Sequence, residues 1–131
     1  MKGIEDFNEI VKEVQEEITS FLYESTPEAP EMIVARGNQL QSYMGRLSKM
    51  LADVKYRQDM AIVYHARESK SEVVSTVMNS YVKAKCSDEN YMVTLIEGLL
   101  RKCYAENEWN RTLISKAKEE YRVNNTNNNV Q

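Results

Sequence analysis

The stretch that decides the fold runs from Ser87 to Arg122 and reads SDENYMVTLIEGLLRKCYAENEWNRTLISKAKEEYR. Its apolar residues recur at steps of three and four, which predicts one long amphipathic helix. No proline interrupts the stretch, and its one glycine, Gly98, costs roughly 1 kcal/mol relative to alanine without ending a helix. The predicted apolar stripe consists of Tyr91, Leu95, Leu99, Trp109, Leu113 and Ala117, flanked by Met92, Ile96 and Ile114.

A helix of this length needs a partner of similar length, because it spans roughly 54 Å and cannot bury its stripe against itself. Residues 31–67 offer such a partner, since their apolar residues also recur at helical spacing. Pro30 is suited to the start of that second helix. We therefore predict an all-α fold in which residues 31–122 form an elongated antiparallel hairpin of two long helices. The stripe of the second helix consists of Leu40, Met44, Leu47, Leu51, Val54 and Ala61.

The segments that flank the long helices are predicted from their polarity. Residues 68–72 are polar enough for a turn, and residues 72–84 predict a short amphipathic helix at the tip of the hairpin. A single helix over residues 31–85 is the alternative. Residues 123–131 are rich in asparagine and lack apolar periodicity, which predicts a disordered tail.

The N-terminal segment, residues 1–26, predicts an acidic amphipathic helix with the seam of a coiled coil. Two prolines define a hinge at residues 27–30, because each removes a backbone donor and disfavours a helical residue before it. We predict that this helix, or else the flank of the hairpin, forms the interface of a homo-oligomer, unless the helix packs on the long helices of its own chain. The seam consists of Ile4, Phe7, Val11, Val14, Ile18 and Phe21.

Charge is distributed unevenly along the 131 residues, although the net charge is only −3. Residues 1–31 carry nine acidic and two basic side chains, a net −7, whereas the rest carries fifteen basic and eleven acidic side chains, a net +4. The favoured interpretation is a solvated acidic helix that is balanced by a basic body. The alternative is an acidic surface for a basic partner, or a basic body for an anion.

The residues that serve catalysis are scarce, so we predict a non-catalytic protein without catalytic residues, metal site or cofactor. His65 is the only histidine, and the cysteines Cys86 and Cys103 have no partners at metal-ligand spacing. The four glycines are isolated, so no phosphate-binding loop is present. Neither an apolar signal core nor a membrane-length apolar run is found, which predicts a cytoplasmic protein with reduced thiols and no membrane contact.

Three glycines within helical segments, Gly37, Gly45 and Gly98, are candidate points of close helix approach. A small residue lets a backbone or a bulky side chain of the facing helix come near. For Gly98 the sequence gives this interpretation no advantage over simple tolerance of glycine.

One face of the last helix carries cations, which makes it a candidate site for an anion or a nucleotide. Arginine offers a planar fork to phosphate, and an aromatic ring can stack on a base. The favoured interpretation is a solvated stripe that pairs with the acidic first helix, with Glu108 and Glu119 nearby. The pI near 5.3 disfavours nucleic acid as a constitutive partner. The candidate residues are Tyr104, Arg111, Ser115, Lys118 and Arg122.

The run Trp109–Glu120, which reads WNRTLISKAKEE and closes a helical hairpin, resembles small all-helical proteins of tailed phages and prophages. This resemblance implies a bacterial or phage-infected cell and a small accessory protein. We therefore expect an oligomeric binding protein that acts in counter-defence, by blocking a host protein or sequestering a small anionic nucleotide. The alternatives are an accessory factor in phage nucleic-acid replication or recombination, and a structural or assembly component.

Overall fold

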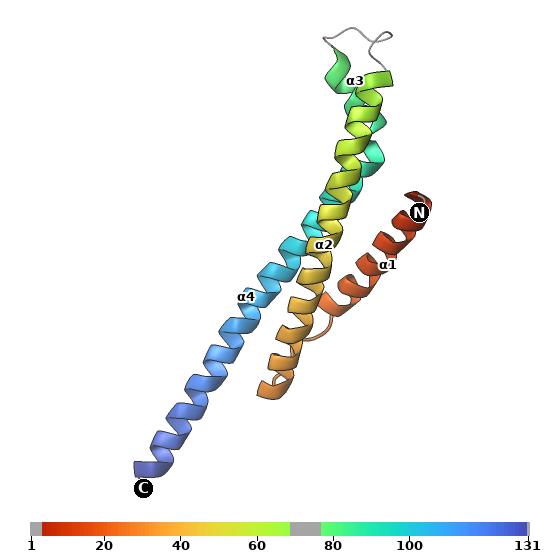
Figure 1. Cartoon of the computed structure of the whole chain (residues 1–131). Coiled ribbons are helices and arrows are strands. Elements are labelled where there is room, and N and C mark those ends of the chain that lie inside the picture. The colour runs from red at the N-terminus through yellow and green to blue at the C-terminus, as the bar shows by residue number, and fades with distance from the viewer. Residues whose placement is uncertain (1–3, 69–76, 131) are drawn as a thin grey trace.

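The computed structural model describes residues 4–68 and 77–130, with side chains for residues 7–68 and 77–126. These residues form helices α1 (Ile4–Leu22), α2 (Pro30–Glu68), α3 (Met78–Lys85) and α4 (Ser87–Val130), and none of them is in a strand. The prediction of an all-α fold with two long packed helices is confirmed, because α2 and α4 lie side by side over most of α2 (Figure 1).

The polar contacts between the two long helices run in opposite residue order, which makes α2 and α4 antiparallel. The side chain of Asn110 contacts the backbone of Ile33 near the start of α2. Farther along α2, Gln58 donates a hydrogen bond to Asn90 over 2.7 Å. The seam between the helices is apolar in its central part. The main core cluster comprises Val11, Val14, Ile18, Tyr43, Leu47, Met50, Val54, Met92, Val93, Ile96, Leu99 and Cys103.

The apolar stripe predicted on the last helix is wrong in its two bulkiest members. Tyr91 is 67% exposed and Trp109 is 52% exposed, so both aromatic rings lie beside the seam. Smaller or polar residues next to Tyr91 and Trp109 are buried in the seam instead. A prediction based on large apolar side chains does not identify such residues. The fully or nearly buried positions of α4 are Met92, Val93, Ile96, Leu99, Cys103, Asn107 and Asn110.

Helix α1 packs against α2 and α4 of its own chain. Val11, Val14 and Ile18 are at most 3% exposed, so this seam has no free area for another copy. The predicted oligomer interface on the seam is replaced by packing within the chain, since these side chains cover the core between the long helices. Phe7 and Phe21 are half-buried at the two ends of the seam, and Ile4 lies outside the residues whose side chains are described.

Basic side chains of α2 contact residues of α1 at the border of the buried seam. Glu17 accepts a hydrogen bond from Arg46 over 3.0 Å and lies 3.5 Å from the Tyr43 hydroxyl. Arg57 lies over the ring of Phe7 at 4.2 Å from its centroid. Among the described residues, the cations that contact α1 belong to α2, whereas the sequence favoured the cationic stripe of α4.

The remaining boundaries differ from the predictions in three places. Helix α1 ends at Leu22, and α3 starts at Met78, whereas the predicted turn at residues 68–72 and the break in the second helix fall largely outside the described residues. Only Cys86 separates α3 from α4, and its amide and carbonyl continue helical hydrogen bonds to Val82 and Asn90. The backbone of residues 123–130 is helical, where the sequence predicted disorder.

Candidate binding site at the open end of the helix pair

Helix α4 continues beyond the start of α2, and this leaves the helix pair open at one end (Figure 1). Pro30, the first residue of α2, shares a surface groove with Ile114 and Ala117 of α4. Past this groove, which reaches Tyr121 on α4, the helix continues without α2 beside it. We call residues 114–130 the α4 extension.

A buried Arg36 marks the inner boundary of this open end. Its guanidinium is 3.4 Å from the Glu106 carboxylate and lies over the Phe21 ring at 4.8 Å from the centroid. Arg36 is only 8% exposed, so water does little to stabilise its positive charge. The Glu106 carboxylate and the Phe21 ring stabilise that charge instead. The side chain links α1, α2 and α4 at one level of the structure.

Asn110 forms the second polar contact of the open end. Its Nδ2 donates to the Ile33 carbonyl over 2.9 Å, while its Oδ1 is buried without a hydrogen-bond partner among the described residues. The same Nδ2 would lie 2.7 Å from a Cβ added to Gly37. Gly37 is therefore a point of close helix approach, as the sequence suggested. Gly98 and Gly45 are not, because a Cβ at either position would meet no atom closer than 4.0 Å.

The groove at the open end is almost wholly apolar and occupies about 310 Å³. Val34 is 49% exposed and Tyr121 is 70% exposed, although both are large apolar side chains beside the groove. Lys118 supplies the one charged side chain of the lining. Such a surface is typical of a site that receives apolar side chains of a partner. The groove is lined by Pro30, Val34, Ile114, Ala117, Lys118 and Tyr121.

The predicted cationic stripe lies on the exposed surface of α4, and its two outer arginines are already paired. Arg111 is 3.4 Å from Glu108, and Arg122 is 2.6 Å from Glu119, each one turn away on the same helix. The hydrogen bond to Glu119 raises the pKa of Arg122. Tyr104 and Ser115 are exposed. The stripe thus presents paired cations on a convex helix surface, and only Lys118 of its five residues lines the groove.

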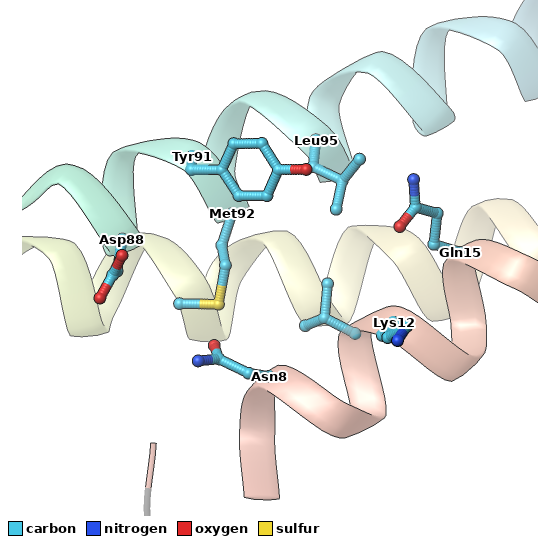
Figure 2. Close-up of a pocket in the computed structure, with 8 residues that line it drawn as sticks. Asn8, Lys12, Gln15, Asp88, Tyr91, Met92 and Leu95 are labelled. Atoms are coloured by element: carbon cyan, nitrogen blue, oxygen red, sulfur yellow. The ribbon is translucent and has the colours of Figure 1, made fainter. Parts of the chain in front are cut away.

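A second cavity, of about 380 Å³, lies between α1 and the first turns of α4 (Figure 2). Val11 and Met92 are its buried members, and Tyr91 and Lys12 are exposed at its edge. The side-chain amides of Asn8 and Gln15 also line the cavity, so its wall is partly polar and partly apolar. This cavity shows that α1 covers the core incompletely at the Asp88 end of α4.

The two thiols are buried in the fold and unsuited to nucleophilic chemistry. Both cysteines are free and 0% exposed. Burial raises the pKa of Cys103, with the nearby Glu106 carboxylate adding to the effect, and burial likewise raises the pKa of Cys86. Since the thiolate is the reactive form, both groups stay protonated and inert near neutral pH.

Other chemistry-bearing residues do not converge in the part of the chain that the structure describes. Within residues 4–68 and 77–130 no group of three or more His, Cys, Asp or Glu side chains is placed to hold a metal ion. His65 is half-buried, and its ring packs edge-on against Tyr64 with centroids 5.2 Å apart. None of the described helices is both long and apolar enough to span a membrane.

The groove was not predicted from the sequence, although its signals were present. Ile114 and Ala117 continue the helical spacing of the α4 seam, and Pro30 marks where α2 begins. Placing the start of α2 beside Ile114 of α4 requires knowledge of how far the two helices are shifted along each other. That register depends on Asn110 and Gly37. Comparisons with protein-family models, curated proteins and solved structures give no match to this chain.

Proposed function

We propose that this chain is a non-catalytic binding protein, an elongated antiparallel hairpin whose open end receives a helix of a partner protein. The observation that carries the proposal is the continuation of the α4 seam through Ile114 and Ala117, at the level of Pro30, into a groove without an intrachain occupant among the described residues. A partner helix placed there would extend the packing that α2 provides along the rest of α4.

The charge around the groove defines the chemistry of the partner. Lys118 lines the groove and forms no ion pair with the described residues. Arg111 and Arg122 lie on the same side of α4, each beside one glutamate. We propose an amphipathic helix that places apolar side chains in the groove and an acidic side chain opposite Lys118.

A phage accessory role in counter-defence, by blocking a host protein, is proposed on the sequence resemblance. A groove for one helix supports that role better than sequestration of a nucleotide, because the two arginines of the stripe are already paired with glutamates. The same pairing gives less support to a role in nucleic-acid replication or recombination.

Site-specific photo-crosslinking in bacterial cells tests the proposal. A photoreactive phenylalanine at Tyr121, beside the groove, should give a discrete protein adduct. The same residue at Tyr23, which is 85% exposed but belongs to the segment after α1, is the control and should not give that adduct. Ala117→Glu should abolish the adduct, and Lys118→Glu should weaken it. An adduct that forms equally at both positions, or that survives Ala117→Glu, would contradict the proposal.

A further inference from the structure

The second half of α2 carries a set of large exposed side chains on its outer face. Tyr56 is 66% exposed, Met60 is 53% exposed and Tyr64 is 56% exposed, and Asp53 and Arg67 are exposed at the two ends. Their spacings of three, four, four and three residues place all five on one side of the helix. We call Asp53, Tyr56, Met60, Tyr64 and Arg67 the α2 outer face.

This face is directed away from the chain's own core. Val54 and Met50 of the same turns are buried against the other helices, at 0% and 9% exposure. The long apolar atoms of the outer face therefore remain in water, although tyrosine, methionine and arginine are the residues enriched in protein interfaces. An occupied outer face would remove this apolar surface from water.

The order of residues on the outer face is symmetric about Met60. Tyr56 and Tyr64 lie four residues before and after it, and Asp53 and Arg67 lie seven residues before and after it. A two-fold axis through Met60 would run a second α2 antiparallel to the first. It would pair each Tyr56 with the partner's Tyr64, and each Asp53 with the partner's Arg67.

We propose that a second copy of this chain packs on the α2 outer face, antiparallel and with Met60 on the two-fold axis. Self-complementarity of this kind is what an isologous interface requires. Charge fixes the direction, because a parallel pair would set Asp53 against Asp53 and Arg67 against Arg67. The proposal does not depend on the groove at the open end.

The size of the face sets the strength of the association. From Asp53 to Arg67 the helix rises about 21 Å, at 1.5 Å per residue. Stable specific interfaces bury roughly 1,200–2,000 Å² in total, with about 20–30 residues on each side, so a face built on five residues lies below that range, among weak contacts. We expect a dimer in concentration-dependent equilibrium with the monomer.

Cysteine crosslinking tests the position of the axis. In Met60→Cys the two new thiols would adjoin each other, so oxidised glutathione should convert the protein to a covalent dimer. The control is Ser42→Cys, on the same side of α2, exposed and 18 residues from the axis. Both native cysteines are buried and free. No dimer with Met60→Cys, or equal dimer with Ser42→Cys, would overturn the proposal.

A charge exchange tests the pairing, with molar mass measured by sedimentation over a concentration series. Asp53→Arg and Arg67→Asp should each raise the dissociation constant by about tenfold or more. The double variant should restore it to within about threefold, because both ion pairs re-form with reversed sign. A wild-type protein that is monomeric throughout, or a double variant no better than the single ones, would overturn the proposal. A heterologous partner on this face would give that monomeric result.

Discussion

The side-chain nitrogen of Asn110 lies 2.7 Å from the position that a Cβ on Gly37 would take. Helices α2 and α4 approach each other closely at this level because one of them has no side chain there. The contact also allows Asn110 to reach the Ile33 carbonyl, so one glycine and one amide fix the register at the open end.

Gly37→Ala should therefore destabilise the fold, by about 1–3 kcal/mol, because the added methyl group must displace Asn110. Gly45→Ala is the matched control on the same helix, where a Cβ would meet nothing within 4 Å. It should raise the free energy of unfolding by roughly 0.5–1 kcal/mol, since alanine favours helix. Urea titrations followed by circular dichroism measure both changes. Equal effects at the two positions would refute this account of Gly37.

The contact between Arg36 and Glu106 should respond unequally to loss of either partner. Glu106→Ala leaves the buried Arg36 charge without its carboxylate, which should cost about 1–3 kcal/mol. Arg36→Met retains the apolar contact with Phe21 and leaves Glu106, whose side chain is 36% exposed, to water. That change should cost less than about 1 kcal/mol. Denaturant unfolding of the two variants decides the order, and the reverse order would exclude a buried charge as the cause.

The packing of α1 on its own chain predicts a large effect at Ile18. Ile18→Ala should lower the free energy of unfolding by about 3 kcal/mol, because the side chain is 0% exposed. Glu16→Ala, an exposed position of the same helix, should change it by less than about 0.5 kcal/mol. The loss at Ile18 should not vary with protein concentration, as measured by thermal unfolding of diluted samples. A loss that grows on dilution would instead place α1 on another copy.

Burial of Cys103 predicts a fall in stability at alkaline pH. Its pKa is raised in the folded state above the ordinary value of 9.0, by burial first and by Glu106 second. The unfolded thiol therefore loses its proton at lower pH than the folded one. Its contribution to stability is complete below about pH 9 and is lost as pH rises further. Free energies of unfolding measured up to about pH 10 should fall less steeply for Cys103→Ala than for the wild type. Parallel slopes would show that Cys103 does not contribute.

The sequence predicted the helices and their pairing because both depend on the spacing of apolar residues such as Leu40, Leu47 and Val54. The prediction of buried positions was wrong where the buried residues are not large and apolar. Asn107, Asn110 and Cys103 occupy the α4 seam, while Tyr91 and Trp109 lie outside it. It also did not distinguish among the glycines, since only the register shows that Gly37 faces Asn110. The groove depends on that register too, because residues of both α2 and α4 line it. The cationic stripe follows from the spacing along one helix alone, so the sequence predicted the stripe and not the groove.

The α4 extension is 17 residues long by its bounds, from Ile114 to Val130, or about 25 Å. A partner helix of about five turns would cover it from the start of α2 to the C-terminal end of α4. A longer helix would project beyond that end and gain no further contact there. The length by which α4 continues past the start of α2 therefore limits how much of a bound helix this protein can shield from water.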